Sequence, residues 1–385
     1  MPEDEHGEKI SRREFLKRLA AGGAGLMLGA SGLFGCVQTA TADSTGVQEA
    51  RYYRKLGDKR VQCTLCPWKC VTSPGQRGIC RVRENRGGTY YTLVHGRASA
   101  LHVDPIEKKP LFHFKPGTHA LSVGTAGCNL RCKDCQNWQL SQRTPEQLKA
   151  EGAWYDASPQ TLVSKARQNN IPIIAYTYNE PIVFYEYMYD TAKLGQSRGV
   201  KSVMISAGNI NAEPMKALAP HLDAIKIDLK GFTDDFYRNY TSGSLEPVKQ
   251  TIKRVVALGK WLEIVYLVVP TLNDDLDEIR RMAEWLLRVG GEDLPLHFSR
   301  FYPAYKLKNL PPTPLDTLRE CRYTAMQAGL NYVYVGNVPG TDIASTHCPQ
   351  CGETVIKRSG FRVLANNIKS NGHCKFCGHK IAGVW

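Results

Sequence analysis

The chain has 385 residues, of which 42% are hydrophobic, and it carries a formal net charge of +14. A chain of this length and composition can bury one large core with one or two small satellite segments, which excludes a disordered protein. Its basic residues are scattered, and no run of lysine and arginine is interleaved with aromatic residues, so no nucleic-acid partner is expected. The charge indicates a solvated basic surface, with binding to an acidic partner as the alternative.

The first residues in chain order indicate a targeting segment, which we assign to residues 1–42. The sequence SRREFLK at residues 11–17 matches the twin-arginine export signal, and a weakly apolar, glycine-rich stretch follows it. Two ends are compatible with the sequence: ATA at residues 40–42 resembles a cleavage site, whereas LFGC resembles a lipobox with Cys36 as the lipidated residue. We therefore expect a periplasmic protein or one tethered to a membrane through this segment, with a cytoplasmic protein as the alternative.

Eleven of the thirteen cysteines form three tight groups, and Cys36 and Cys321 stand alone. Cysteines separated by only two residues suit a metal held by thiolates better than a disulfide framework, because the chain is long enough to build its own core. We therefore interpret the chain as a metalloprotein. The three groups are Cys63, Cys66, Cys70 and Cys80; Cys128, Cys132 and Cys135; and Cys348, Cys351, Cys374 and Cys377.

The first cysteine group lies in a loop-rich segment that we place at residues 43–118. Four thiolates close a zinc site or hold an accessory iron–sulfur cluster that relays electrons, and the sequence does not separate these two, although we favour zinc. The segment ends in DPIEKKPLFHFKPG at residues 104–117, whose prolines and aromatic residues suit a strap over the mouth of the following domain. This strap either only covers that domain or forms a wall that faces the substrate.

Residues 119–340 alternate apolar strand-like runs with helical stretches. Helix signals lie between the runs, such as Ser158 as an N-cap before Pro159, and a later helix places Cys321 on its apolar face. Repeated strand–helix units with nearly continuous apolar strands predict an α/β fold, with a parallel sheet curled into a full or partial (β/α) barrel. Chemistry in such a fold collects at the carboxyl ends of the strands. The predicted strands are residues 119–124, 173–178, 201–206, 224–229, 261–269, 296–301 and 332–335.

The second cysteine group follows the first of these strands, in GTAGCNLRCKDCQNW at residues 124–138. A structural zinc site needs four ligands, whereas three thiolates in an iron–sulfur cube hold three irons and leave the fourth iron free. With its C-x3-C-x2-C spacing directly after a strand, the sequence resembles the radical S-adenosylmethionine (SAM) superfamily. The resemblance implies that Cys128, Cys132 and Cys135 hold a 4Fe–4S cluster. Such a cluster cleaves bound SAM reductively to a 5'-deoxyadenosyl radical that abstracts hydrogen from a substrate.

Polar residues stand at the ends of the later strands, where the resemblance implies cofactor contacts. YTYNEP resembles the superfamily's Gly-Gly-Glu motif, with Tyr178 and Asn179 in place of the two glycines and the glutamate expected to meet the methionine amino group. IKIDLKG resembles the Asp-x-Lys of glycyl-radical activating enzymes, whose lysine approaches the methionine carboxylate. One departure is Asp134, where the superfamily usually has an aromatic residue near adenine. We predict cofactor binding by Asn179, Glu180, Ser206, Asn209, Asp228, Lys230 and His297, the last resembling a ribose-side histidine.

These strand-end residues also have a structural interpretation, because polar groups at strand ends commonly cap the next helix and a single histidine commonly serves the core. No residue that acts on the substrate itself is predicted.

The third cysteine group lies in a C-terminal segment, residues 341–385. HCPQCG and HCKFCG form two C-x2-C knuckles, which is close to the four-cysteine zinc-ribbon pattern. A segment this short has little core of its own, so metal binding would supply much of its folding free energy. We predict structural zinc at Cys348, Cys351, Cys374 and Cys377, with a rubredoxin-like iron site as the alternative.

Seven motifs occur together in one order and spacing: CTLCPWKC, DPIEKKPLFHF, GCNLRCKDCQNW, YTYNEP, DLKGF, RFYPAY and the terminal GVW. Over residues 51–385 they resemble the radical SAM enzyme of the AmmeMemoRadiSam system, which is similar to pyruvate formate-lyase activating enzymes. The resemblance implies partnership with Memo-like and AMMECR-like proteins and with a low-potential electron donor, and it names no substrate. Three hypotheses follow: this radical enzyme acting on an unidentified substrate, an activating enzyme that installs a glycyl radical on a protein, and a non-catalytic iron–sulfur and zinc scaffold or electron carrier.

Overall fold

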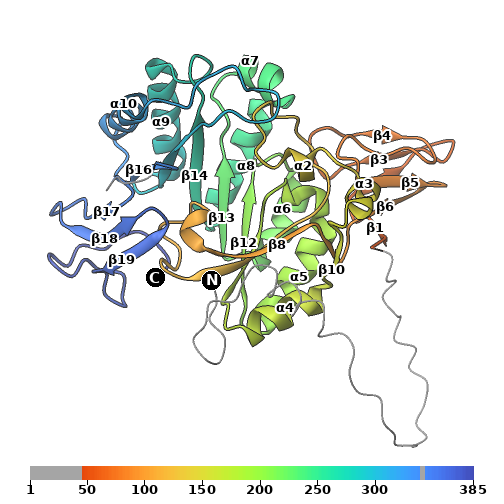
Figure 1. Cartoon of the computed structure of the whole chain (residues 1–385), viewed down its shortest axis with the longest axis horizontal. Coiled ribbons are helices and arrows are strands. Elements are labelled where there is room, and N and C mark those ends of the chain that lie inside the picture. Colours follow the sequence, from red (N-terminus) through yellow and green to blue (C-terminus); the bar gives the residue numbers. More distant parts are fainter. Residues whose placement is uncertain (1–45, 339–342) are drawn as a thin grey trace, which may run out of the picture. The chain divides into compact units, whose positions relative to one another are not determined.

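An eight-stranded, mostly parallel sheet forms the centre of the fold in the computed structural model, which describes residues 46–338 and 343–385 (Figure 1). Seven parallel strands neighbour one another in chain order, and each predicted strand is confirmed to within two residues at either end. The predicted export segment, with Cys36, lies outside the described residues. The seven strands are β9 (His119–Gly124), β11 (Ile173–Tyr176), β12 (Lys201–Ser206), β13 (Ala224–Asp228), β14 (Trp261–Val268), β15 (Leu296–Arg300) and β16 (Val333–Gly336).

The sheet is open, because β8 (Ala100–Pro105) and β16 occupy its two edges. β8 pairs antiparallel with β9 and was not expected from the sequence. This strand is only half buried and ends in a proline, which lacks a backbone N–H and is tolerated at a sheet edge. The predicted parallel sheet is therefore confirmed in its main part, and one antiparallel edge strand is added to it.

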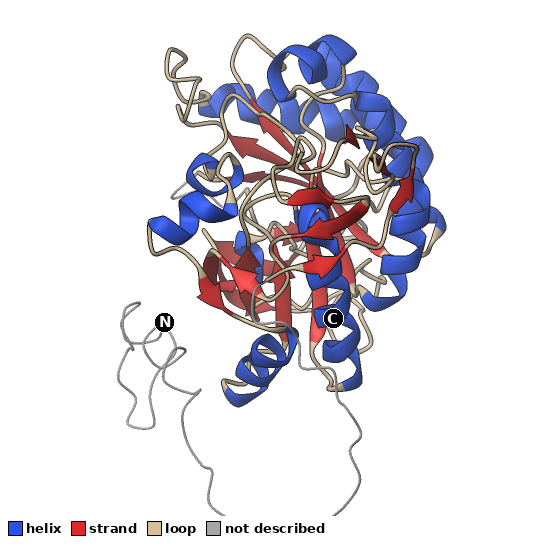
Figure 2. Cartoon of the chain, turned by 90° about the vertical axis from the view of Figure 1, so that its right-hand side faces the viewer, coloured by secondary structure: helices blue, strands red, loops and turns tan. Residues whose placement is uncertain are grey.

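Helices cover the outer side of the sheet and carry the crossovers between its strands (Figure 2). The crossover helices are α4 (Pro159–Gln168), α5 (Tyr185–Ser197), α6 (Ala212–Leu218), α8 (Leu245–Ala257), α9 (Leu276–Gly290) and α10 (Leu315–Gln327). The shorter helices are α2 (Trp138–Ser141), α3 (Pro145–Ala150), α7 (Asp234–Phe236), η1 (Ile106–Lys108), η2 (Pro181–Phe184), η3 (Ala219–His221) and η4 (Tyr237–Thr241).

The helix starts carry the residues that the sequence predicts. The Ser158 hydroxyl accepts a hydrogen bond from the Thr161 backbone N–H, directly before Pro159. Cys321 is a buried thiol on α10, as expected. Within the described part of the chain, no helix is both long enough and apolar enough to cross a membrane.

Small antiparallel sheets precede the large one and carry the first cysteine group. One sheet joins β1 (Gln48–Glu49), β6 (Thr89–Thr92) and β5 (Arg83–Arg86), a second joins β2 (Tyr53–Lys55), β3 (Val61–Cys63) and β4 (Val71–Thr72), and β7 (Arg97–Ala98) pairs with β10 (Tyr155–Asp156). A buried ion pair anchors this part to α5, since both terminal guanidinium nitrogens of Arg83 donate to Glu186 at 2.8 Å. Burial alone raises the pKa of Glu186, but the Arg83 charge outweighs it and the pKa lies below its usual value. The pair is therefore held in its ionised form.

The strap packs along the sheet. Its side chains Ile106, Leu111 and Phe114 form one buried cluster with residues of β9, β11, β12 and β13. Glu263 of β14 fixes the backbone of the strap, because its carboxylate accepts the N–H groups of Phe112 and His113, each at 2.9 Å. The strap is thus part of the core of this sheet.

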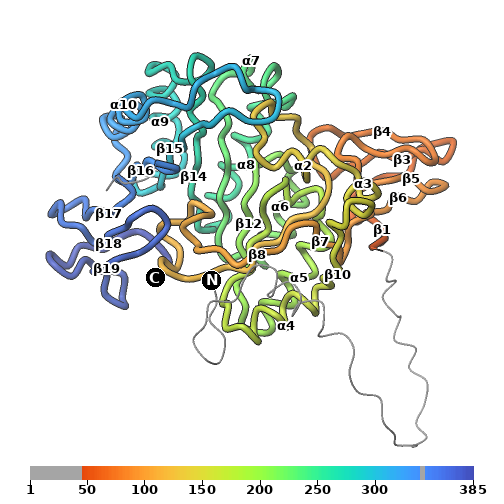
Figure 3. The backbone as a smooth tube through the Cα atoms, in the orientation of Figure 1, coloured from red at the N-terminus to blue at the C-terminus, as the bar shows by residue number. Residues whose placement is uncertain are grey.

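The C-terminal segment lies beside the strap, as the blue and orange parts of the tube show (Figure 3). It contains the sheet β17 (Thr346–His347), β18 (Thr354–Ser359) and β19 (Arg362–Asn366). The guanidinium of Arg358 on β18 donates to the Phe112 carbonyl at 2.6 Å, and the Val384 N–H donates to the His113 carbonyl at 2.7 Å. The third cysteine group is therefore attached to the strap through buried hydrogen bonds.

His113 completes this attachment in one protonation state. Its Nδ1 faces the Ala382 carbonyl at 2.6 Å, so Nδ1 carries the hydrogen and Nε2 accepts from the Tyr334 hydroxyl. Burial lowers the pKa of His113 to about 4, and the nearby Glu263 only partly offsets this. The imidazole is therefore neutral in the folded protein at neutral pH.

We expect Glu186→Gln to destabilise the protein by about 3–5 kcal/mol, because Arg83 would remain buried without its counter-ion. The measurement is the midpoint of urea unfolding. Glu213→Gln is the matched control, since Glu213 is 76% exposed in its pair with Lys216 and its loss should cost less than about 0.5 kcal/mol. Equal effects of the two substitutions would contradict the anchoring role.

We also expect acid to weaken the fold through His113. The unfolded chain binds a proton to this imidazole near pH 6.5, whereas the folded protein binds it only near pH 4, so stability is lost as the pH falls between these values. The loss amounts to about 3 kcal/mol. His113→Gln should flatten the pH dependence of the unfolding midpoint in this window, and substitution of the exposed His119 by Gln should leave it unchanged.

Candidate active site

The loop after β9 is held against the amino-terminal part of the chain at Gly127. This glycine has a φ of +82°, and a Cβ added there would lie 2.3 Å from the carbonyl oxygen of Cys80. No other residue fits such a close approach. The backbone next to Cys128 is therefore fixed in direct contact with the first cysteine group.

Two further elements hold the same loop. Asn179, at the end of the second parallel strand, accepts the Thr125 N–H at 3.1 Å and donates to the Gly127 carbonyl at 2.6 Å. Two carbonyls of η4 accept the N–H groups of Arg131 and Lys133 at 2.8 and 3.2 Å. The predicted cofactor residue Asn179 thus has a position in the cavity wall and a structural role in orienting the loop.

The three thiols of the loop line a cavity of about 560 Å³, which is in the size range of small-molecule sites. The cavity lining contains Cys128, Cys132 and Cys135 and no fourth cysteine. Burial raises the pKa of the Cys128 thiol to about 12. A bound cation would reverse this effect, because thiolates are the form that ligates metals. The donor set therefore fits an iron–sulfur cluster, which Cys128, Cys132 and Cys135 would hold through their thiolates.

Glu180 lies in the wall of this cavity as a rigidly held carboxylate. One of its oxygens accepts the Ser206 hydroxyl at 2.6 Å, and the other accepts the Ala207 N–H at 2.7 Å. Burial raises the pKa of Glu180, and these two donors partly counteract it. The oxygen that faces Ser206 also accepts the Ile182 N–H at 3.3 Å, so it is the other oxygen that keeps a free lone pair, which suits a cationic group of a ligand.

A chain of alternating charges lies on β13 and its end. Lys226, Asp228 and Lys230 share one face of the strand because they are two residues apart. The Asp228 carboxylate lies 2.5 Å from the Lys226 ammonium and 3.4 Å from the Lys230 ammonium. Burial lowers the pKa of Lys230, but Asp228 and the neighbouring thiols outweigh it and raise the pKa. Two ammonium groups against one carboxylate leave a positive charge that suits an anionic group of a ligand.

The other predicted cofactor residues have structural partners. Ser206 contacts Glu180, and the Asn209 carbonyl accepts the side-chain amide of Asn129 at 3.1 Å. His297 lines the cavity, but its Nε2 lies 2.8 Å from the Glu263 carboxylate and so carries the hydrogen, which leaves only Nδ1 for a ligand. Of this group, His297 alone is part of the cavity lining, and Ser206 and Asn209 lie behind it.

Tyr178 occupies the first glycine position of the Gly-Gly-Glu motif and has a φ of +73°. Such a conformation is costly for a bulky residue and persists only where the surroundings enforce it. The Tyr178 hydroxyl donates to Asp104 at 2.8 Å, and its carbonyl accepts from Asn137 at 2.8 Å. These two hydrogen bonds hold Tyr178 in this conformation.

The sequence analysis left open whether the strap forms a wall, and it named neither the residues of the strap nor those of the C-terminal segment that line the cavity. Lys109 is buried, pairs with Asp104 at 2.7 Å and lies 4.9 Å from the centre of the Tyr178 ring. Lys226 was also missed, although a lysine inside an apolar strand is a usable signal. The strap therefore forms a wall of the cavity as well as a cover for the sheet. The missed lining residues are Glu107, Lys108, Lys109, Phe112, Lys226, Ser299, Asn337 and Phe361.

Asp134 lies outside the cavity lining. It is 8% exposed, and burial raises the pKa of its carboxyl, with Lys230 acting in the opposite direction. Aromatic rings for the cavity come instead from Phe112, Tyr178, Phe298 and Phe361.

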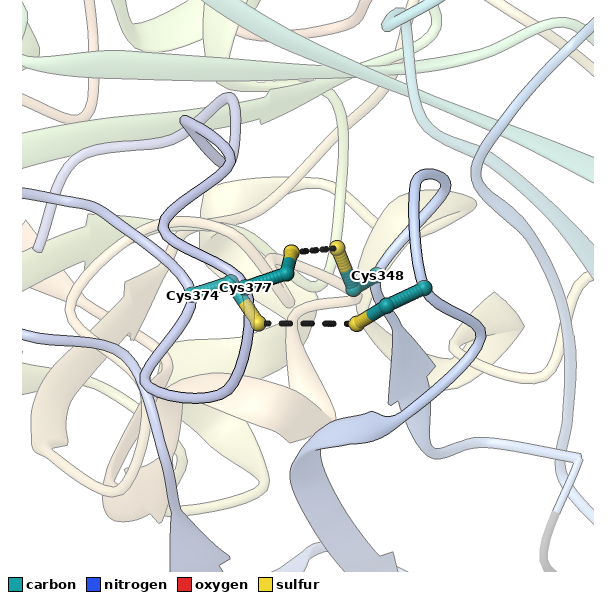
Figure 4. Close-up of side chains that lie close together, drawn as sticks. Cys348, Cys374 and Cys377 are labelled. Atoms are coloured by element: carbon teal, nitrogen blue, oxygen red, sulfur yellow. Dashed lines mark hydrogen bonds between the residues drawn. The ribbon is translucent and has the colours of Figure 1, made fainter.

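The C-terminal cysteines are brought together as predicted (Figure 4). Their sulfur atoms all lie within 4.8 Å of one another, with Cys348 and Cys377 at 3.6 Å and Cys351 and Cys374 at 3.9 Å. Sulfur ligands about 2.3 Å from one tetrahedral ion stand about 3.8 Å apart, so the set fits a single metal ion. Its identity as zinc remains a prediction. The first cysteine group lines a second, buried cavity of about 20 Å³.

The sequence profile of the radical SAM superfamily matches residues 122–286. The chain is 44% identical over 336 residues to the uncharacterized protein MJ0808 of Methanocaldococcus jannaschii, and the match covers 87% of this chain and 99% of that protein. It is 24% identical over 204 residues to the pyruvate formate-lyase-activating enzyme of Clostridium pasteurianum, covering 48% of this chain and 80% of that enzyme.

A third relative is the (2S)-3-sulfopropanediol dehydratase activating enzyme of Klebsiella oxytoca. It is 23% identical over 143 residues, which cover 34% of this chain and 45% of that enzyme. The matched superfamily segment contains the loop of Cys128, Cys132 and Cys135, and also Glu180, Asp228 and Lys230. The chain therefore contains a radical SAM superfamily domain at residues 122–286 and is an enzyme.

Proposed function

We propose that the protein cleaves S-adenosylmethionine reductively and uses the resulting radical to abstract hydrogen from a substrate that is still to be identified. The observation that carries the proposal is the wall of the large cavity, which brings three cluster-loop thiols together with Glu180 and the Asp228–Lys230 pair. When bound, a 4Fe–4S cluster with SAM supplies a 5'-deoxyadenosyl radical.

The residues of this chain would hold and orient the cofactor. A free amino acid group carries one ammonium and one carboxylate. Glu180 offers a fixed acceptor oxygen for the ammonium, and Lys230 offers a donor for the carboxylate. Asp228 keeps Lys230 in place and charged, while Ser206 keeps Glu180 in one orientation. The Glu180 carboxylate is buried and the Lys230 side chain is only 24% exposed, so their interactions are stronger than in water.

A second candidate function is activation of a glycyl-radical enzyme. Two of the relatives carry the name of an activating enzyme, and the Asp-x-Lys spacing at residues 228–230 resembles that group. In this case the abstracted hydrogen would come from a backbone glycine of a partner protein. A glycyl-radical signal in the electron paramagnetic resonance (EPR) spectrum of such a partner would distinguish this function from action on a small molecule.

We further propose that Memo-like and AMMECR-like proteins act with this enzyme and that a low-potential protein donates its electrons. The motifs at residues 51–385 support this proposal through the resemblance set out above. We also propose export through the twin-arginine signal, with periplasmic or membrane-associated residence. Cell fractionation tests the location, and a protein found wholly in the cytoplasm at full length would contradict it.

The radical chemistry predicts that the reconstituted, dithionite-reduced protein forms 5'-deoxyadenosine from SAM under anaerobic conditions. Cys132→Ala should abolish this product, because the loop would lose one of its three thiolates. The measurement is chromatographic quantification of the nucleoside. Absence of product from a fully reduced cluster, with the Memo-like and AMMECR-like proteins both present, would contradict the proposal.

We expect Lys230→Met to weaken SAM binding by about 10–100-fold, because a charge-assisted hydrogen bond is worth about 1.5–3 kcal/mol. The iron content should not change, since Lys230 is not a ligand. The raised pKa keeps Lys230 charged at neutral pH. Titration of Lys230 should therefore not change the SAM affinity between about pH 6 and pH 9. Equilibrium dialysis with labelled SAM measures the affinity, and Lys216→Met on the exposed face of α6 is the control.

A further inference from the structure

We propose that Cys63, Cys66, Cys70 and Cys80 hold a second iron–sulfur cluster, which passes electrons to the cluster of the radical SAM loop. All four thiols line one buried cavity of about 20 Å³. The rest of its lining is mostly apolar and includes Leu65, Ile79, Ile182 and Val183. Four thiols around one small cavity are a donor set that suits a metal centre.

Two buried hydrogen-bond donors of the cavity wall have no acceptor within the described residues. They are Nε of Arg83 and the hydroxyl of Tyr90, whose side chains are among the most completely buried of the protein. A Cβ added to Gly78 would lie 2.8 Å from the Tyr90 hydroxyl and 3.6 Å from the Cys70 sulfur, so both atoms meet at the same point of the wall. Unpaired buried donors are costly, and the sulfur atoms of an anionic cluster would accept from them.

The spacing of the sulfur atoms separates a cluster from a single ion. The C-terminal cysteines form the one set in the described ranges whose ligand atoms all lie within 4.8 Å of one another. The sulfur atoms of the first cysteine group do not meet this distance limit, and neither do those of Cys128, Cys132 and Cys135. A single tetrahedral ion needs that close packing, whereas each thiolate of an iron–sulfur cube binds a different iron and stands farther from the others. The structure therefore favours a cluster over the zinc that the sequence analysis preferred.

The position of the cavity suits electron transfer to the radical SAM loop. The Cys80 carbonyl packs on Gly127, immediately before Cys128, as described above. On the other side of Cys128, Asn129 lines the cavity of the first cysteine group, and its carbonyl accepts the indole N–H of Trp68 at 2.7 Å. The segment that contains the first cysteine group thus contacts both Gly127 and Asn129, the two neighbours of Cys128.

This path carries one electron at a time. A low-potential iron–sulfur or flavin protein donates one electron to the second cluster. The second cluster then passes this electron to the radical SAM cluster and is reoxidised. No proton or bond change is needed for these transfers. The relay rests on the proposed function, whereas the presence of a second cluster does not.

The deciding experiment uses the full chain with Cys128→Ala, Cys132→Ala and Cys135→Ala combined. After anaerobic reconstitution with iron and sulfide, we expect about four irons and four sulfides per chain, against about eight of each in the unaltered protein. Bound zinc at the C-terminal group should be unchanged and reports that the chain is folded. A triple variant with no iron and a second zinc would overturn the proposal.

A second variant tests the cluster without removing a ligand. Tyr90→Phe, added to the triple variant, should keep the iron and sulfide content and shift the midpoint potential to a more negative value, because a hydrogen bond to the cluster is lost. Redox titration followed by EPR measures this potential. An unchanged potential would overturn the placement of the cluster beside Tyr90. Neither measurement involves SAM, so failure of the SAM chemistry and failure of this proposal are distinguishable.

Discussion

The close backbone contact at Gly127 is the constraint on which the arrangement of the cavity depends. It joins the loop of Cys128 to the carbonyl of Cys80, so that the small sheets before residue 98 and the large sheet share one rigid point. Asn179 fixes the same loop from the neighbouring strand. Three thiols can face one cavity only because the chain between them is held from both sides.

The cavity wall carries charges of both signs, which suits a ligand that itself carries both signs. Glu180 stands at the end of one strand, and Lys226 and Lys230 flank Asp228 two strands away. Burial strengthens each of these interactions, so the orientation of a zwitterionic ligand would be specified by both ends. In the proposed function Ser206 and Asp228 would act as positioning residues, because they hold Glu180 and Lys230 in place.

Glu263 connects the periphery to this cavity. It accepts backbone N–H groups of the strap and lies 2.8 Å from Nε2 of His297, while Arg358 of the C-terminal segment donates to the strap. The C-terminal segment, the strap and His297 are therefore joined by a continuous set of buried hydrogen bonds. The C-terminal segment also supplies Phe361 to the lining.

The sequence alone determined the seven parallel strands, the three cysteine groups and the charged pair on β13, because hydrophobic periodicity and short cysteine spacings are local properties. It did not reveal β8, whose polar, half-buried pattern is typical of loops as well as edge strands. Only the tertiary structure brought Lys109 and Phe361 to the cavity and placed the first cysteine group against Cys128. These are contacts between residues far apart in the chain, and they are set by packing that no local pattern records.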